Sequence, residues 1–403
     1  MAYADDTSDL TPDQVLLKQE AHRFAAEVLR PTAAALDDLR PDEVIAAGSP
    51  LWDAFRKSYK TGHHLRSFPP HLGGAGLGPL ESHLIGEEFG WGNSGLSISL
   101  SVTAMPFRFA AMNGNPDLMR EIVMPFVEDT EGKYVGCWGA TEPNHGSDLI
   151  MGGSDPKVHL ECTARRDGDE WVIDGQKSSW VSNGTIATHT LAFLNVQPER
   201  GMMGTGIAVV PLNLPGVTKG PPLNKLGQRP LNQGEIFFDS VRIPAHYMLV
   251  EPPHAMAGIE AILAGANAGM STTFSGVARA AFEEALAYTQ SRIQGGALLS
   301  QHQLVQKRLF DMFMRVQASR ALSRKANLRL ATGQPTAHYS MAAKVFATRT
   351  AFDVASDASE LFGGMGMVKG VLVESLMRDA RASLIEDGAN DTLSIAAARL
   401  LLD

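Results

Sequence analysis

The stretch TARRDGDEWVIDGQ, residues 163–176, has the pattern of short strands separated by Asp-Gly pairs at 167–168 and 174–175. Such pairs are typical of tight hairpin turns. Similar β-rich runs, including SWVSN (179–183), continue from about Gly132 to Pro244 without helical segments between them. This order predicts an antiparallel sheet or barrel and argues against a dinucleotide-binding βαβ unit.

Helical patterns flank the β-rich region on both sides. Thr11 and Pro12 predict the start of a first helix, and Pro31 is expected to end it. After the β-rich region, apolar spacing predicts long bundle helices over 303–330 and 339–362. We therefore expect an α+β fold with an N-terminal helical domain (1–130), a central antiparallel β domain (131–245) and a C-terminal helical bundle (246–403).

Composition and charge exclude several classes of protein. A net charge of −9 argues against a nucleic-acid binder, which needs a basic surface. The two cysteines, Cys137 and Cys162, form no disulfide framework and no zinc-binding spacing, so no metal site is expected. No run of about 18 apolar residues predicts membrane insertion, and the start MAYADDTSDL lacks the features of a signal peptide. A cytoplasmic location is therefore expected.

Two polar loops are candidates for ligand binding. In WGATEPNHGSD (138–148), hydroxyls and backbone amides could bind carbonyls or phosphates, although an ordinary capped turn explains the loop equally well. In GQKSSWVSNGT (175–185), a tryptophan between small polar residues could stack on a flat ring, although a buried core tryptophan has the same pattern.

Two further stretches lie near the C-terminus. FGGMGM (362–367) follows a predicted helix, and helix termination explains its glycines. IEDGAND (385–391) places adjacent carboxylates and a glycine between two helix-forming segments. These residues either end one helix and cap the next, or hold a carboxylate in place to remove a proton.

Taken in order, the motifs resemble those of the acyl-CoA dehydrogenase family of flavoproteins. TEPNHGSD resembles the family's TEPxxGSD loop, and DGQKSSWVSNG resembles its NGxKxWITNG strand. KLGQRPLNQGEIFFDSVRIP (225–244) is similar to KxGxRxSxTxExxFxxVxVP, and YTQSRIQGGALLSQHQLVQ (288–306) to YxxxRxxFGxxLxxxQxxQ. FPPHLGGAGLG (68–78) and LFGGMGMVKGVLVESLMRDARASLIEDGAND (361–391) match its early loop and closing motif. The resemblance therefore covers nearly the whole chain.

The resemblance implies two helical domains around a β domain, with one FAD per subunit and a homotetramer arranged as a dimer of dimers. It implies α,β-dehydrogenation of an acyl-CoA thioester. A carboxylate would remove the α proton while the β hydrogen leaves as hydride to flavin N5. An electron-transfer flavoprotein is the expected electron acceptor.

The resemblance also assigns binding residues by position. Trp138, Ala140 and Thr141 are expected on the pyrimidine side of the flavin, and Trp180 and Ser182 near N5. The other expected cofactor contacts are Ser147, which also lies near the CoA portion, Arg292 and Gln303 across a dimer interface, Glu360, Gly363 and Gly364 at the adenosine end, and Ala389 and Asp391. The expected substrate contacts are Ser147, Asn267, Glu386 and Gly388.

Asp387 falls on the position of the family's catalytic glutamate, and Glu386 on that of the neighbouring tyrosine. The aspartate is one methylene shorter, so either the substrate's α carbon lies closer or the backbone has shifted. Glu386 would be the base only if the glycine were displaced. The resemblance associates aspartate here with alicyclic substrates such as cyclohexane- or cyclohexene-carboxyl-CoA. Ala266 and Asn267 occupy positions where other branches carry a base and an arginine.

Three hypotheses follow from these observations. The first is an FAD-dependent acyl-CoA dehydrogenase, and the second is a flavin-dependent hydroxylase or a non-oxidative elimination enzyme on the same fold. The third is a non-catalytic binding protein that retains a flavin site. A hydroxylase of this type needs no α-proton base, so the carboxylate at 387 favours the dehydrogenase. The largely intact flavin motifs argue against a binding protein.

Overall fold

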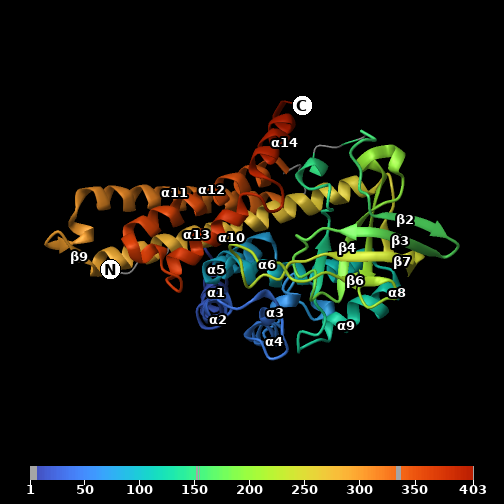
Figure 1. Ribbon diagram of the computed structural model, residues 1–403, viewed down its shortest axis with the longest axis horizontal. Helices are drawn as coiled ribbons and strands as arrows, with labels where there is room; N and C mark the ends of the chain where they lie inside the picture. Colours follow the sequence, from blue (N-terminus) through green and yellow to red (C-terminus); the bar gives the residue numbers. More distant parts are fainter. Residues whose placement is uncertain (1–6, 151–152, 154, 333–336, 403) are drawn as a thin grey trace.

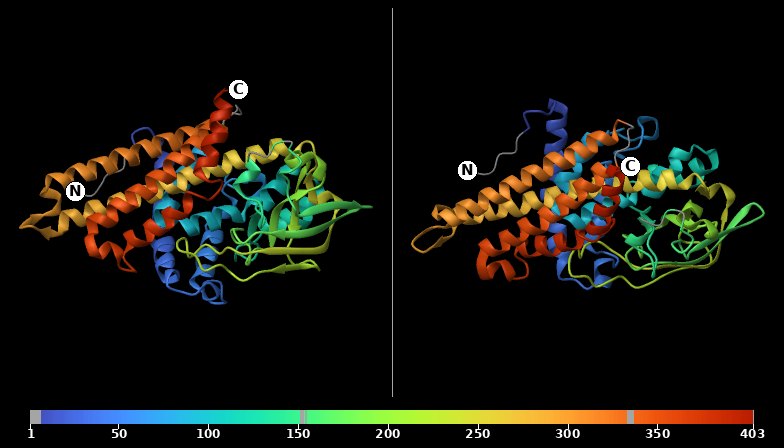
Figure 2. Two further views of the ribbon diagram at one scale, coloured as in Figure 1. Left: turned by 45° about the horizontal axis from the view of Figure 1, so that its top comes forward. Right: turned by 90° about the horizontal axis from the view of Figure 1, so that it is seen from above.

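The computed structural model describes residues 7–150, 153, 155–332 and 337–402. Its N-terminal helices lie beneath a long C-terminal helical bundle on one side and a β-sheet on the other (Figure 1). The bundle and the sheet lie end to end in both further views (Figure 2). The predicted α+β fold, with helical segments before and after a central sheet, is confirmed. Among these described residues, no helix is long and apolar enough to cross a bilayer.

The N-terminal part is helical, and its first helix begins where the sequence predicts. The Thr11 side chain caps it in a capping box with Gln14. The prediction that Pro31 ends the first helix is wrong, because the helical run continues past this residue. A π-helical turn, Ala25–Leu29, precedes the proline, which then lies in the first turn of the next segment. The helices are α1 Pro12–Phe24, α2 Arg30–Asp37, α3 Pro41–Val44, α4 Pro50–Lys60, α5 Pro79–Gly92, α6 Ser94–Thr103, α7 Met105–Asn113, α8 Pro116–Leu118 and α9 Met124–Val127.

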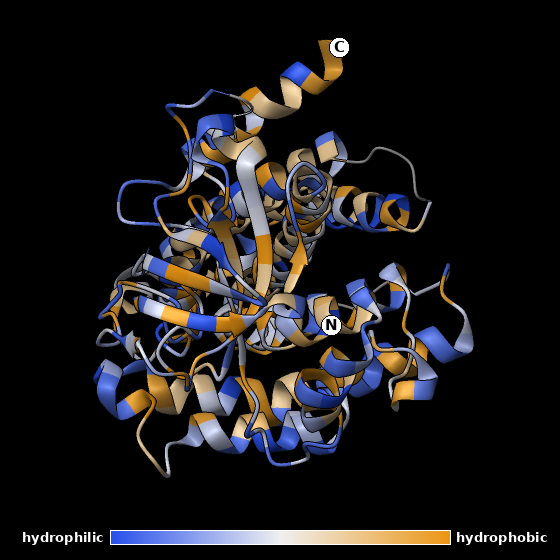
Figure 3. Cartoon of the chain, turned by 90° about the vertical axis from the view of Figure 1, so that its right-hand side faces the viewer, coloured by the Kyte–Doolittle hydropathy of each residue, from blue (hydrophilic) through white to orange (hydrophobic). Residues whose placement is uncertain are grey.

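The central sheet has the strand order β6-β7-β3-β2-β4-β5-β8, with β1 beside β4. Most neighbours are antiparallel, but β1 pairs with β4 in parallel, as do β2 and β4 at one residue pair. The prediction of a purely antiparallel sheet is wrong in this respect, and the sheet extends beyond Pro244 into β8. The strands are β1 Gly136–Gly139, β2 Thr163–Asp167, β3 Glu170–Lys177, β4 His189–Asn195, β5 Thr205–Pro211, β6 Val217–Lys219, β7 Ile236–Pro244 and β8 Met248–Val250. Hydrophobic and hydrophilic segments alternate along strands at this end of the molecule (Figure 3).

The two Asp-Gly pairs have different roles. The pair at 167–168 forms the turn between β2 and β3, as predicted, with Gly168 at φ 61°. The pair at 174–175 lies inside β3, where the pairing with β7 shifts register. It forms a β-bulge in which Gly175 has a φ of 132°, so the predicted second hairpin is wrong. The SWVSN run is also not a strand, because it has only an isolated bridge from Ser182 to Gln233.

The C-terminal part consists of long helices. α10 (Ala255–Ser291, 37 residues) runs from beside the sheet to the far end of the bundle (Figure 1). A small hairpin of β9 (Ile293–Gln294) and β10 (Ala297–Leu298) follows it. The prediction for residues 303–330 is confirmed, and the second predicted helix begins two residues early. The remaining helices are α11 Gln303–Leu330, α12 Ala337–Phe362, α13 Leu372–Ser383 and α14 Asn390–Leu402.

Glycines allow α5 and α10 to approach each other closely. A Cβ atom added to Gly276 on α10 would lie 2.1 Å from the Glu87 carbonyl oxygen on α5. A Cβ atom on Gly90 would lie 2.1 Å from the Thr273 carbonyl oxygen. Backbone atoms on the opposing helix cannot rotate away, so both positions require glycine.

We predict that Gly276→Ala destabilises the protein by about 1–3 kcal/mol, the usual cost of forcing an extra group into a packed core. Gly265→Ala on the same helix is the matched control, because nothing lies within 4 Å of its added Cβ atom. Thermal unfolding should show a lower midpoint for the first variant and an unchanged or higher midpoint for the second. Equal midpoints for the two variants would contradict this view of the helix contact.

Candidate active site

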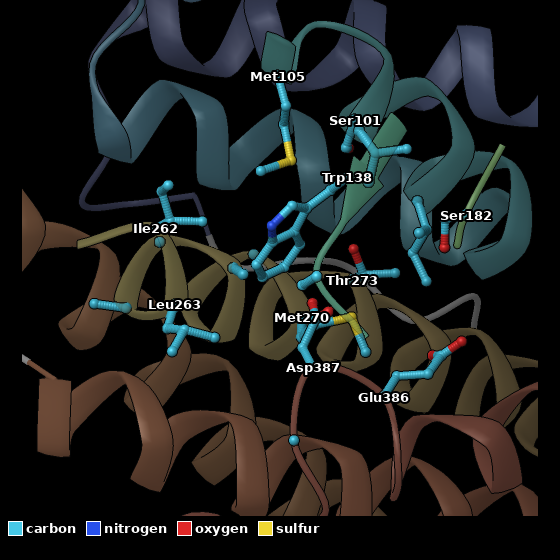
Figure 4. A pocket seen from close by; sticks show the side chains of 18 of the residues that line it. Ser101, Met105, Trp138, Ser182, Ile262, Leu263, Met270, Thr273, Glu386 and Asp387 are labelled. Atoms are coloured by element: carbon cyan, nitrogen blue, oxygen red, sulfur yellow. The ribbon is translucent and has the colours of Figure 1, made fainter. Parts of the chain in front are cut away.

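A cavity of about 1990 Å³ lies between the sheet, α6, α7, α10 and the loop before α14. Figure 4 shows Ser101 and Met105 on one side of it, Trp138 and Ser182 in the middle, and Glu386 and Asp387 on the opposite side. Met270 and Thr273 of α10 also face this space. The predicted site residues that line it are Trp138, Ala140, Thr141, Ser147, Trp180, Ser182, Glu386, Asp387 and Gly388.

A buried ion pair joins the two polar loops. Lys177 Nζ donates to Glu142 Oε1 over 2.6 Å, and both side chains are fully buried. Glu142 also accepts a hydrogen bond from the backbone N–H of Cys162. Directly after Lys177, the Ser178 N–H donates to the Thr141 carbonyl over 3.0 Å. The end of β3 and the loop after β1 are therefore fixed together, which places both loops at the same cavity.

The middle of the cavity fits a flat aromatic cofactor. The Trp180 side chain remains 60% exposed beside the cavity, which a core tryptophan would not be. Trp138 Nε1 is buried, and no described residue accepts its hydrogen bond. Exposed aromatic faces, unpaired polar atoms and backbone-rich loops suit the isoalloxazine ring of FAD. The residues present are therefore compatible with the predicted cofactor.

Asp387 lies in the tight loop between α13 and α14. Its φ is 49°, in the left-handed region that aspartate tolerates better than most residues. Gly388 follows at φ 101°, where an added Cβ atom would lie 2.7 Å from Ile150 Cδ1. Lys344 Nζ donates to the Gly388 carbonyl over 2.7 Å. The Ala389 N–H donates to Ser147 Oγ over 2.9 Å. The loop is therefore held on both sides of the carboxylate.

The protein environment changes the acidity of both adjacent carboxylates. Burial raises the pKa of Asp387, and the positive charge of Lys344 partly opposes this rise. Burial raises the pKa of Glu386 to about 7, against the effects of a hydrogen bond from Gln228 and the charge of Lys225. Burial also lowers the pKa of Lys344 and of Lys225 to about 8. Both carboxylates are thus better proton acceptors than free ones.

Several predicted site residues do not line the cavity. Asn267 is fully buried and donates to the Leu263 carbonyl, so its placement does not support the predicted substrate contact. Arg292 and Gln303 are exposed beside the hairpin at the far end of the bundle, which a contact to another subunit would require. The other residues outside the cavity lining are Glu360, Gly363, Gly364, Ala389 and Asp391. Of these, Glu360 forms an ion pair with Arg308.

Sequence reasoning missed the residues that hold the carboxylate loop. Gln228 donates to Glu386 Oε2 over 2.8 Å and lies in the KLGQR motif, whose spacing could have indicated it. Asp379 is buried and accepts a hydrogen bond from the Gln228 N–H. Lys344 is fully buried on α12, but a single lysine in a helical pattern usually indicates a solvated face. No signal in the sequence distinguished it.

We predict that Lys177→Met destabilises the protein by about 3–5 kcal/mol, because it leaves the buried Glu142 charge without its partner. The double variant Glu142→Gln/Lys177→Met removes both charges and should regain part of this loss. Thermal unfolding midpoints of the single and double variants test the prediction. A double variant that is no more stable than Lys177→Met would show that the uncompensated charge is not the cause.

Comparison with known proteins shows the family. Models of the N-terminal, middle and C-terminal domains of acyl-CoA dehydrogenase match residues 11–129, 137–241 and 258–402. A probable acyl-CoA dehydrogenase of Bacillus subtilis, YngJ, is 30% identical over 98% of this chain and 99% of its own. Butyryl-CoA dehydrogenase from Megasphaera elsdenii is 27% identical with a TM-score of 0.87, covering 99% of this chain and 100% of its own. A chain from a study of the electron transferring flavoprotein of Acidaminococcus fermentans has the same identity, coverage and TM-score. The chain therefore belongs to the acyl-CoA dehydrogenase family, and it is an FAD-dependent acyl-CoA dehydrogenase.

Proposed function

We propose that Asp387 is the base that removes the α proton of the bound acyl-CoA thioester. The observation that carries this proposal is a carboxylate on the cavity wall whose pKa is raised by burial. An α proton is weakly acidic, so a base of raised pKa removes it more readily than an ordinary aspartate does. Bound FAD supplies the acceptor for the hydride that leaves the β carbon.

The residues around Asp387 position it and adjust its charge. Lys344 fixes the Gly388 carbonyl and favours the ionised form of Asp387. Ser147 holds the Ala389 N–H, so the loop cannot rotate freely. The enolate oxygen that forms needs hydrogen-bond donors. We assign one of these to the backbone N–H of Asp387, as the family resemblance implies.

The flavin-binding residues in this proposal are those that line the middle of the cavity. Trp138, Ala140 and Thr141 would contact the pyrimidine side, and Trp180 and Ser182 the region near N5. Two features support this assignment, namely the exposed Trp180 ring and the unpaired Trp138 Nε1.

The more distant cofactor contacts belong to a proposed homotetramer arranged as a dimer of dimers. Arg292 and Gln303 are exposed at the far end of the bundle, where they would reach the FAD of a neighbouring subunit. Glu360, Gly363 and Gly364 would hold the adenosine end. The space beside Gly363 and Gly364 is open, because no atom lies within 4 Å of an added Cβ atom.

We further propose an alicyclic acyl group, such as cyclohexane- or cyclohexene-carboxyl, and an electron-transfer flavoprotein as the electron acceptor. The support for a ring is the family resemblance, which associates an aspartate at this position with alicyclic substrates, and a ring is wide enough to place its α carbon differently from a straight chain. Anaerobic titration with acyl-CoAs tests the function. A dehydrogenase loses its yellow colour when a substrate is added, whereas a hydroxylase requires a separate reductant.

We predict that Asp387→Asn retains FAD but slows flavin reduction by about 10²–10⁴-fold, the usual contribution of a general base. Glu386→Gln is the matched control, because it changes the adjacent carboxylate and can still bond to Gln228. It should slow reduction by less than tenfold. Stopped-flow absorbance gives both rates. If Glu386→Gln were the slower variant, Glu386 would be the base.

We predict that Lys344→Gln moves the acidic limb of the pH–rate profile to higher pH. Lys344 lowers the pKa of Asp387, so loss of its charge raises that pKa, and a higher pH is then needed to ionise the base. Glutamine retains a donor for the Gly388 carbonyl, which separates the effect of charge from that of the hydrogen bond. Exposed Lys369→Gln is the control. A uniform loss of rate without a shift would indicate only a structural role for Lys344.

A further inference from the structure

Two of the arginines that line the cavity lie on the side formed by the N-terminal helices, whereas Arg378 and Arg381 line it from α13. Arg66 follows the short helix His63–Leu65, and Arg108 lies on α7. Met105, Phe109 and Met112 line the cavity together with Arg108, at the spacing of one helix face. Arg108 therefore belongs to the face of α7 that is turned to the cavity.

No carboxylate in the described part of the chain neutralises these two cations. Among the described residues, no Asp or Glu oxygen lies within 4.0 Å of a nitrogen of Arg66 or Arg108. Arg66 Nη2 donates to Ser101 Oγ over 3.4 Å, a weak contact to a neutral group. Exposed arginines elsewhere in this part of the chain are paired, as Arg120 is with Asp117. The two guanidinium groups are thus positioned for a partner outside the described protein.

The surroundings of the pair change the acidity of both guanidinium groups. Burial, together with the charge of Arg108, lowers the pKa of Arg66 to about 10. Burial also lowers the pKa of Arg108. The neighbouring His63 has a pKa of about 4, so it is neutral and adds no negative charge. Arg66 is half-buried and Arg108 is exposed, so two interacting like charges lie at the cavity wall, where an anion that binds both stabilises them.

We propose that the cavity takes acyl groups whose end away from the thioester carries a carboxylate, which Arg66 and Arg108 bind. The substrate class is therefore the mono-CoA thioesters of dicarboxylic acids. A planar guanidinium matches a carboxylate in geometry and charge, so two of them select it over a neutral chain end. The assignment rests on the proposed function for the thioester chemistry at Asp387. It holds for a ring or a chain, because it concerns only the far end of the acyl group.

The position of the pair favours the acyl end over the phosphates of CoA. Ser101, which contacts Arg66, lies across the cavity from Asp387 in Figure 4. A thioester beside Asp387 can therefore extend its acyl group toward Arg66. The CoA portion is assigned instead to the loop at Ser147.

Equilibrium binding without turnover tests the proposal. Calorimetry on the FAD-loaded Asp387→Asn protein would compare glutaryl-, adipyl- and pimelyl-CoA with pentanoyl-, hexanoyl- and heptanoyl-CoA, which have the same chain lengths. At least one dicarboxylic thioester should bind more than tenfold more tightly than its neutral partner. Arg66→Met and Arg108→Met should each reduce that ratio below threefold, with the neutral thioesters changed less than twofold. Arg56→Gln, which alters an exposed arginine of α4, should leave the ratio unchanged.

Three results would overturn the proposal. The first is that every neutral thioester binds as tightly as the dicarboxylic thioester of the same length, or more tightly. This comparison uses no arginine variant, so it does not depend on how those variants fold. The second is a loss of affinity for free CoA in Arg66→Met as large as the loss for the dicarboxylic thioester, because the arginines would then bind CoA phosphates. The third is a preference that survives both substitutions. Failure of the proposed dehydrogenase function would be a different result, in which no thioester bleaches the flavin of the wild-type protein.

Discussion

The buried pair of Lys177 and Glu142 is the interaction on which the cavity depends. It joins the end of β3 to the loop after β1, and the residues on either side of it include Trp138, Thr141 and Trp180. Two opposite charges with no exposed surface are stable only together. The sheet can therefore present two irregular loops to one cavity without regular strand pairing between them. The wall at which we propose that the flavin binds is consequently held together by the fold itself.

The carboxylate loop is held in a similar way but from the opposite side of the cavity. Its conformation needs a glycine at 388, a lysine from α12 and a serine from the loop after β1. Lys344 and Ser147, which are far apart in the chain, therefore form hydrogen bonds with Gly388 and Ala389, the two residues directly after Asp387. The neighbouring carboxylate of Glu386 accepts a hydrogen bond from Gln228, whose backbone N–H in turn donates to Asp379. The two carboxylates can thus differ in acidity and role although they are adjacent in sequence.

Much of the fold could be predicted because its signals are local or periodic. The apolar spacing from Gln303 to Leu330 defines one helix, and the turn at Asp167-Gly168 follows from two residues. Asp174-Gly175 misled the prediction because a glycine at positive φ serves in a bulge as well as in a hairpin turn. Motif order located Asp387 at the cavity wall. Lys344, Arg66 and Arg108 could not be found in this way, since their significance depends on burial and on segments brought together by folding.

Helix α10 contributes to both ends of the molecule. Met270 and Thr273 form part of the cavity wall, and the same unbroken helix of 37 residues ends next to Arg292. At 1.5 Å per residue it is a rod of roughly 55 Å. This one rod therefore connects the hairpin beyond Ser291 with the cavity wall at Met270 and Thr273. A substitution that tilts this helix would therefore displace the hairpin and the cavity wall together.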